Sequence, residues 1–217
     1  MRNLLAKEFR LSAHILSYLF IAFGAMAMIP GYPITLGAFF VCLGLFQTFQ
    51  AARENNDVLF TALLPVAKTD VVRARYAFVV CIELASFLLM AVLTILRMTV
   101  LADAAVYVNN AMMNANQVFL AWVLVIFALF NVIFVGGFFK TAYKFGKPFV
   151  VFIVVSFVVV AVAEALHFFP GLAWLNATAT MGNGLMWGIL AAAVVLFALV
   201  TWLSLRRSCT RFEAIDL

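Results

Sequence analysis

The chain has 217 residues, of which 67% are hydrophobic and only 11% are charged, and its formal net charge is +5. Soluble domains are roughly 45–50% apolar and about 25% charged, so this chain has too little polar surface to cover a water-soluble globule. The composition excludes a soluble enzyme, a disordered protein and a nucleic-acid reader. The basic excess must therefore be explained by a membrane.

Six apolar stretches follow one another along the chain. Each of the last four is long enough for a helix of about 20 residues that crosses a bilayer. The first two are shorter and are separated only by Pro30-Gly31-Tyr32-Pro33, which favours a tight hairpin over one bent helix. The sequence predicts an all-α membrane protein, a single domain over residues 1–217, with six transmembrane helices at about 15–29, 34–49, 76–101, 117–139, 149–169 and 185–205.

The basic residues predict how these helices are oriented. All but one of the 14 lysines and arginines fall in four segments, 1–14, 51–75, 140–147 and 206–211, that six spans would place on one side of the membrane. By the positive-inside rule this side is the cytoplasm, so both termini are expected there. The exception is Arg97, whose side chain we expect to extend to the outer headgroups.

The first fourteen residues combine a polar stripe with an apolar remainder. The stripe repeats at spacings of 4, 3 and 4 residues and consists of Asn3, Lys7, Arg10 and His14. Leu4, Leu5, Phe9 and Leu11 occupy much of the rest. This pattern predicts an amphipathic helix lying in the inner headgroup layer. The alternative is a charged lead-in to the first span.

Residues 51–75 form the longest cytoplasmic loop, and it has an unusual composition. Acidic Glu54 and Asp57 come first, and they suit a helix amino terminus. An apolar stretch follows, with Leu59, Phe60, Leu63 and Leu64, and Pro65 then disfavours helical geometry at Leu64. Thr69 would cap the next helix. The loop thus predicts a short cytoplasmic helix whose exposed apolar residues mark a protein contact, or alternatively an interfacial helix that touches only lipid.

The loop also carries a resemblance. Glu54-Asn55-Asn56-Asp57, Leu63-Leu64-Pro65-Val66, Lys68, Asp70 and Arg75-Tyr76 resemble the loop of small bacterial type-2 ABC exporter permeases. The opening residues 2–8 are similar to the elbow helix of those permeases, and the six-span layout matches over the whole chain. The resemblance implies a coupling helix in 51–75 that docks on a separate ATPase subunit. The expected docking residues are Glu54, Asn56, Asp57, Leu59, Phe60, Leu63, Leu64 and Pro65.

The resemblance has further implications. It implies a permease dimer, either a homodimer or a paralogous heterodimer, in a bacterial plasma membrane, with a re-entrant segment at 170–184 on the outer face. The chain itself has no phosphate-binding loop, because Gly146-Lys147 is followed by Pro148. We therefore expect a non-catalytic subunit that binds no cofactor, with ATP and Mg on the partner ATPase. The expected cargo is an amphipathic or hydrophobic substrate such as a peptide, moved outward.

The alternative function is a stand-alone secondary transporter or channel. Glu83 is the candidate for a transport path, because a charge at mid-bilayer costs at least about 2.5–3.5 kcal/mol and should face protein or water. Glu164 and His167 are spaced to share a hydrogen bond near the outer end of the fifth span. We expect Gly184 and Gly188 to pack within one subunit. The 24 phenylalanines are the default expected for lipid-facing helices and do not indicate a ligand cage.

Overall fold

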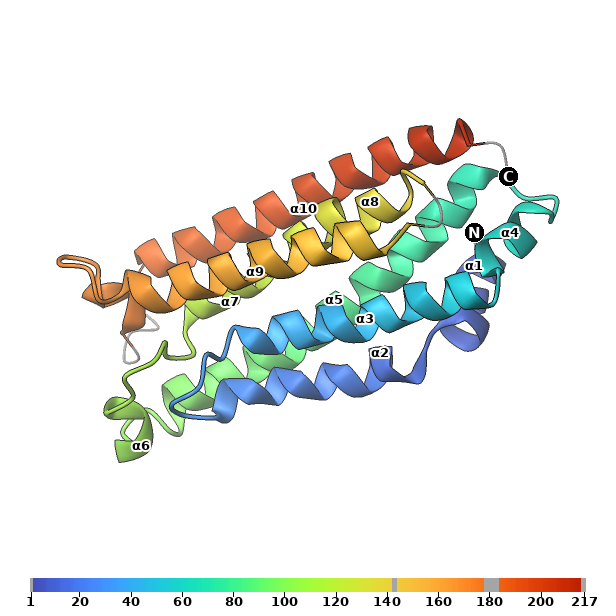
Figure 1. Cartoon of the computed structure of the whole chain (residues 1–217). Helices are drawn as coiled ribbons and strands as arrows, with labels where there is room; N and C mark the ends of the chain where they lie inside the picture. The colour runs from blue at the N-terminus through green and yellow to red at the C-terminus, as the bar shows by residue number, and fades with distance from the viewer. Residues whose placement is uncertain (1, 142–143, 178–183, 216–217) are drawn as a thin grey trace.

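The computed structural model describes residues 2–141, 144–177 and 184–215, which contain helices, turns and loops but no strand. The helices lie alongside one another in an elongated bundle (Figure 1). Among the described residues, five helical stretches are long and apolar enough to cross a membrane. They are α3 (Leu36–Glu54), α5 (Lys68–Thr99), the stretch Gln117–Phe138, α9 (Gly146–Leu166) and α10 (Gly184–Glu213). These five correspond to the last five predicted spans.

The chain before α3 is bent. Helix α1 (Arg2–Lys7) continues as the π-helix η1 (Glu8–Ser12), and the axis then turns by 96° into α2 (Ile15–Leu19) and the 3-10 helix η2 (Phe20–Met28). A 3-10 helix rises about 2.0 Å per residue, so α2 and η2 together extend about 25 Å. That length approaches the hydrocarbon core of about 30 Å.

The predicted hairpin between the first two apolar stretches is confirmed. Gly31 adopts a φ of 70° in the turn, and η2 packs against α3. The two helices approach closely at Gly44, where a Cβ atom would lie 2.7 Å from the Cβ of Phe20. The Ser17 hydroxyl donates to the Gly44 carbonyl oxygen at 2.8 Å. A glycine is thus required where the two helices touch.

The stretch Gln117–Phe138 lies at the centre of the bundle. It consists of α7 (Gln117–Leu129), the π-helix η3 (Phe130–Val135) and α8 (Gly136–Phe138). Of its 18 most apolar consecutive residues, 72% are buried inside the protein, compared with 28% for the corresponding part of α9 and of α10. Helices α3, α5, α9 and α10 all pack against α7.

Many of the phenylalanines are buried inside the bundle, so lipid contact alone does not account for their abundance. The fully buried ones include Phe49, Phe78, Phe119, Phe127, Phe130, Phe134, Phe138, Phe139, Phe152 and Phe212. Phe46 stacks on Phe149 with ring centroids 3.8 Å apart. Lipid and protein core are both apolar, so hydrophobicity alone cannot distinguish a lipid-facing ring from a packed one.

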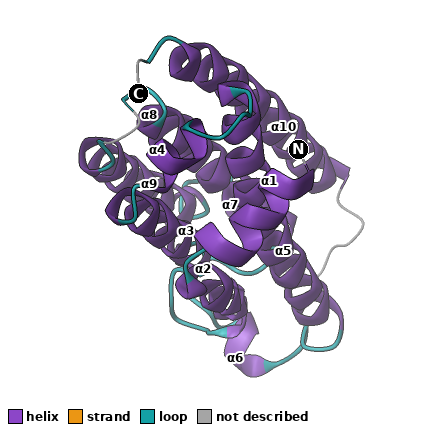
Figure 2. Ribbon diagram, turned by 90° about the vertical axis from the view of Figure 1, so that its right-hand side faces the viewer, coloured by secondary structure: helices purple, strands orange, loops and turns teal. Residues whose placement is uncertain are grey.

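Both ends of the described chain lie at the end of the bundle that carries α4 (Asp57–Ala62), here called the α4 end (Figure 1). Lys68 Nζ donates to the carbonyl oxygen of Ile215 at 2.6 Å, which ties the start of α5 to the last described residues. Figure 2 looks onto this end and shows α1 lying across it. The opposite end, here called the α6 end, carries α6 (Ala105–Val108) and the 3-10 helix η4 (Ala173–Asn176).

Arg97 lies at the α6 end, and the prediction that its side chain reaches the headgroups is wrong. The residue is only 4% exposed. Its guanidinium donates to the Ala27 carbonyl oxygen at 2.6 Å and to Asn114 Oδ1 at 3.1 Å, and it lies 4.1 Å from the centre of the Tyr107 ring. The end of η2 and the 109–116 segment supply these acceptors from within the chain, so the side chain does not need to reach water.

At the α6 end, three asparagines link two segments that lie far apart in the sequence, η4 and the segment that leads into α7. Asn114 N donates to Asn176 Oδ1 at 2.6 Å, and Asn114 Nδ2 donates to the Asn176 carbonyl oxygen at 3.3 Å. Asn116 Nδ2 donates to the carbonyl oxygens of Leu175 and Ala177, at 2.7 and 3.2 Å. We call Asn114, Asn116 and Asn176 the asparagine clasp. It holds η4 against the segment that leads into α7.

Two other expectations at this end are corrected. Glu164 Oε2 accepts from the backbone N–H of Met113 at 2.8 Å, whereas the His167 ring packs on Phe168, so the predicted Glu164–His167 hydrogen bond is absent from the described contacts. Gly184 and Gly188 do not pack against other described parts of the chain, since a Cβ built on either meets none of them within 4 Å. Of the predicted re-entrant segment 170–184, residues 173–176 form η4, and residues 178–183 lie outside the described residues.

Candidate functional site

The loop between α3 and α5 contains the short helix that the sequence predicts. Helix α4 follows a turn in which Asn56 has a φ of 52°, a left-handed conformation that asparagine tolerates better than most residues. The helix ends at Ala62 and is followed by Pro65, as predicted. The predicted cap at Thr69 is wrong, because α5 already begins at Lys68 and Ala67 occupies the cap position without a side-chain bond.

Large apolar side chains point away from the protein on α4 and just after it. Phe60 is 63% exposed, Leu63 is 78% exposed and Leu64 is 40% exposed. Pro65 is exposed beside them. Phe60, Leu63 and Leu64 are here called the apolar ridge. Leu59 lies in α4, but its side chain is outside the described residues. An apolar surface at the polar end of a bundle is the kind of feature that marks a contact site.

The two predicted acidic residues of this site behave differently. Glu54 is exposed at the end of α3, where its carboxylate accepts a hydrogen bond from Gln50 Nε2 at 3.1 Å. Asn56 is exposed in the adjoining turn. Asp57 instead turns inward and contacts Lys7, Ser12 and Arg75, which lie in α1, η1 and α5. Its charge therefore holds α4 in place.

Asp57 belongs to a group of four charges here called the ion cluster: Lys7, Glu8, Asp57 and Arg75. Arg75 Nε lies 2.7 Å from Glu8 Oε2, and Arg75 Nη2 lies 2.8 Å from Asp57 Oδ2. Lys7 Nζ lies 2.5 Å from Asp57 Oδ1 and donates to Thr61 Oγ1 at 2.6 Å. The cluster thus joins α1 and η1 to both α4 and α5.

The cluster is largely sealed from solvent. The side chains of Glu8 and Arg75 are 2% and 4% exposed, and that of Asp57 is 15% exposed. Burial raises the pKa of Glu8 above its ordinary value of 4.5, and this effect outweighs the opposing attraction of Arg75 and Lys7. The Arg75 guanidinium also lies 5.4 Å from the centre of the Phe49 ring, at the end of α3. Arg75 is therefore the residue on which these helices converge.

Sequence reasoning did not identify the cluster, although one signal was present. Arg75 lies on the face of α5 that also carries Val71, Val72, Phe78 and Val79, at spacings of three and four residues on either side. An arginine at the centre of an apolar helical face needs a buried carboxylate partner. The pattern indicates that need, but the partner lies 67 residues away in the chain.

Glu83 is fully buried in α5, with 0% exposure. Asn131 Nδ2, from the π-helix η3, donates to Glu83 Oε2 at 2.9 Å and to Thr201 Oγ1 at 3.1 Å. The Asn131 carbonyl oxygen accepts from the Ser204 hydroxyl at 2.7 Å. π-Helical turns are frequent at functional sites. The assignment of Glu83 to a transport path stays a prediction.

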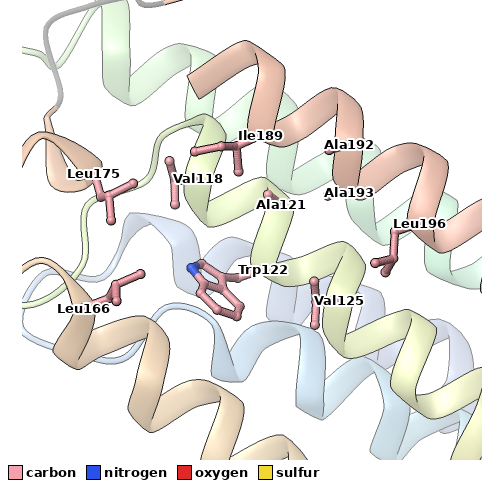
Figure 3. Close-up of a pocket in the computed structure, with 10 residues that line it drawn as sticks. All are labelled: Val118, Ala121, Trp122, Val125, Leu166, Leu175, Ile189, Ala192, Ala193 and Leu196. Atoms are coloured by element: carbon pink, nitrogen blue, oxygen red, sulfur yellow. The ribbon is translucent and has the colours of Figure 1, made fainter. Parts of the chain in front are cut away.

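A separate apolar pocket of about 280 Å³ lies between α7, α9 and α10, towards the α6 end (Figure 3). Its lining includes Val118, Trp122, Leu166, Leu175, Ile189 and Leu196. The Trp122 indole nitrogen is the one polar side-chain atom among these residues. The pocket can therefore accommodate hydrocarbon but offers no group that would hold an ion. Among the described residues, no cluster of histidine, cysteine or acidic side chains could hold a metal.

The fold and the site define a class: a multi-pass helical membrane protein with an apolar ridge on and just after the short helix α4, at one end of the bundle. The family comparison gives the particular family. A model of the ABC-2 family transporter proteins matches residues 3–213, so the chain belongs to this family and is a permease subunit of a type-2 ABC transporter. Neither the curated proteins nor the solved structures contain a match.

Proposed function

We propose that this chain is the permease of an ATP-driven exporter and that the apolar ridge docks on a separate ATPase subunit. The observation that carries the proposal is the exposure of Phe60, Leu63 and Leu64 at the α4 end. They lie on and just after a helix that the ion cluster fastens to the rest of the protein. A solvated ridge of this kind would be unfavourable without a partner. The family implies an ABC ATPase as that partner.

The proposed topology has six spans with the α4 end in the cytoplasm. The α2–η2 stretch would be the first span, because its length of about 25 Å nearly matches the hydrocarbon core. The 96° bend before it supports an elbow helix formed by α1 and η1 in the inner headgroup layer. The clustering of lysines and arginines in the segments at this end supports the same orientation, in the plasma membrane of a bacterium.

The ion cluster suggests how a displacement of α4 would be transmitted to the helices in the membrane. ATP binding would close the partner ATPase dimer, with ATP and Mg held there, and would displace the docked α4. Asp57 is paired with Lys7 and Arg75, so α4 cannot shift without moving α1 and the start of α5. Tilting of these helices in a permease dimer would open a path outward for an amphipathic or hydrophobic substrate.

The decisive experiment is co-purification of the permease with the ATPase encoded beside it. Phe60→Asp and Leu63→Asp should each abolish the complex and its permease-dependent ATPase activity, because they place a charge in an apolar contact. Val108→Asp is a matched control, because Val108 is 59% exposed but lies at the α6 end. An intact complex with both ridge variants would refute docking through α4.

A stand-alone secondary transporter is the second candidate, and the buried Glu83–Asn131 pair is the observation that favours it. It predicts proton- or voltage-linked flux in vesicles that contain the permease and no ATPase. Glu83→Gln should abolish that flux. Inert vesicles would contradict this candidate and leave the exporter proposal standing.

A further inference from the structure

A second cavity, about 430 Å³ in volume, opens between α10 and the η3–α8 stretch, in the half of the bundle nearer the α4 end. We call it the arginine groove. Its apolar part is lined by Val132, Val200 and Leu203, its floor by Gly136 and Ser204, and its outer part by Arg207 and Arg211. Polarity thus changes along the groove, from hydrocarbon-like to cationic.

The floor of the groove is fixed by a close approach of two helices. A Cβ atom at Gly136 would lie 2.9 Å from Ser204 Oγ, so the missing side chain is what lets the backbones come together. The Ser204 hydroxyl is engaged inward, because it donates to the Asn131 carbonyl oxygen at 2.7 Å and lies 2.8 Å from Tyr76 Oη. The guanidinium groups of Arg207 and Arg211 are therefore the polar groups that a ligand would meet.

These two arginines are suited to bind one anion. They lie four residues apart, on one face of α10. Both are exposed, and neither forms an ion pair with any carboxylate that the structure describes. Arginine binds phosphate oxygens through planar, paired donors. The outer part of the groove therefore has the chemistry of a phosphate site.

The length of the groove matches one leaflet of a bilayer. Val200 and Arg211 are separated by roughly 16 Å along a straight helix, and half of a hydrocarbon core is about 15 Å. A phospholipid with its phosphate at Arg211 and Arg207 would thus lay an acyl chain along Leu203, Val200 and Val132. The apolar part of the groove would thus contact the acyl chain, and its cationic part would contact the phosphate.

We propose that the arginine groove is a binding site for an anionic phospholipid of the leaflet at the α4 end. Two guanidiniums facing one phosphate favour a headgroup of net negative charge, such as phosphatidylglycerol. They disfavour a zwitterionic headgroup, whose ammonium would meet two cations. The proposal does not depend on ATPase docking, because the groove lies on α10 and η3–α8 and includes no residue of the apolar ridge.

The test is lipid titration of the purified full-length chain in detergent, followed by native mass spectrometry. Phosphatidylglycerol and phosphatidylcholine with identical chains are compared, and phosphatidylglycerol should be retained preferentially. Arg207→Gln and Arg211→Gln should each weaken its retention about fivefold. Arg206→Gln is the matched control, because Arg206 packs on the Trp202 ring, 4.1 Å from its centre, outside the groove lining.

Three results would overturn the proposal. Equal losses for Arg206→Gln and Arg207→Gln would mean a diffuse surface charge rather than a site. Equal retention of the two lipids would mean that the charge of the headgroup does not affect binding. Competition by inorganic phosphate as strong as that by phosphatidylglycerol would mean an anion site without an acyl groove. Val132→Phe, which narrows the groove and leaves both arginines in place, should also reduce lipid retention. The thermal unfolding midpoint of each variant shows that it is folded.

Discussion

Arg75 Nε and Glu8 Oε2 lie 2.7 Å apart, and this contact joins the first helices of the chain to the start of α5 where solvent is almost excluded. Burying two charges costs nearly as much as their attraction returns, so an intact pair adds little stability. Removing Arg75 leaves the buried Glu8 carboxylate with only the more distant Lys7 Nζ, at 3.8 Å, to compensate its charge. The value of the pair therefore lies in holding η1, α4 and α5 in one arrangement.

We expect Arg75→Gln to destabilise the protein strongly, because it leaves the two buried carboxylates of Glu8 and Asp57 with Lys7 as their one remaining cation in the ion cluster. Loss of one member of a buried ion pair costs about 3–5 kcal/mol in the free energy of unfolding. Arg73→Gln is the control, since Arg73 pairs with Asp70 at 3.2 Å with its side chain 54% exposed. An exposed pair contributes at most about 1 kcal/mol. Unfolding in increasing dodecyl sulfate measures both variants, and equal losses would contradict a special role for Arg75.

Asp57→Asn should loosen α4 while leaving the bundle folded. The variant loses the charged contacts to Lys7 and Arg75, and hydrogen bonds to charged groups contribute about 1.5–3 kcal/mol each. Amide hydrogen exchange within 57–62 should therefore accelerate at least about tenfold. Glu54→Gln removes an exposed carboxylate and should leave the exchange rates unchanged. Unchanged rates in Asp57→Asn would show that the ion cluster does not hold α4.

The dependence of stability on pH should include a contribution from Glu8. Burial raises its pKa in the folded protein above the ordinary value of 4.5, so the folded state binds the proton more tightly than the unfolded state. This contribution to stability is full below pH 4.5 and is lost as pH rises through the raised pKa. Unfolding midpoints measured upward from pH 4.5 should fall in the wild type, and Glu8→Gln should remove that component. A slope that survives in Glu8→Gln would assign it to another group.

Two glycine substitutions should differ in their effect on stability, because one glycine lies in a close helix contact and the other on an open helix surface. Gly44→Ala places a Cβ atom 2.7 Å from the Phe20 Cβ and 2.8 Å from the Leu16 carbonyl oxygen, and such overpacking costs typically about 1–3 kcal/mol. Gly188→Ala meets no described atom within 4 Å and should be neutral or gain up to about 1 kcal/mol from helix propensity. The unfolding midpoints of the two variants test this, and a loss at Gly188 would indicate that another chain covers it.

Much of the fold could be predicted because its signals are local. Five of the predicted spans, the hairpin at Gly31 and the helix ending before Pro65 all follow from apolar length and from backbone-restricting residues. The α2–η2 stretch was harder to assign, because part of its length comes from the larger rise per residue of a 3-10 helix. Hydropathy reports how apolar a stretch is and not the rise per residue of its helix.

The errors concern side chains whose partners are distant in the sequence. Arg97 was expected at the headgroups, yet its acceptor at Ala27 lies 70 residues away. Asp57 pairs with Lys7 and Arg75 inside the protein, a contact that the sequence did not predict, and its part in ATPase docking stays a prediction. Glu8 gave no local signal at all, since one acidic residue in a basic helix suits either solvent or burial. Such pairings depend on the tertiary arrangement, which periodicity does not specify.

The asparagine clasp has a consequence for motion at the α6 end. Asn114 and Asn116 bond to the backbone of η4, and Asn176 bonds in return to the 112–116 segment. Each hydrogen bond contributes about 0.5–1.5 kcal/mol, and five of them join the same two short segments, so moving the segments apart breaks them together. Separation of η4 from the start of α7 should therefore be a cooperative, all-or-none event. This end of the protein would then switch between two discrete states and would not widen gradually.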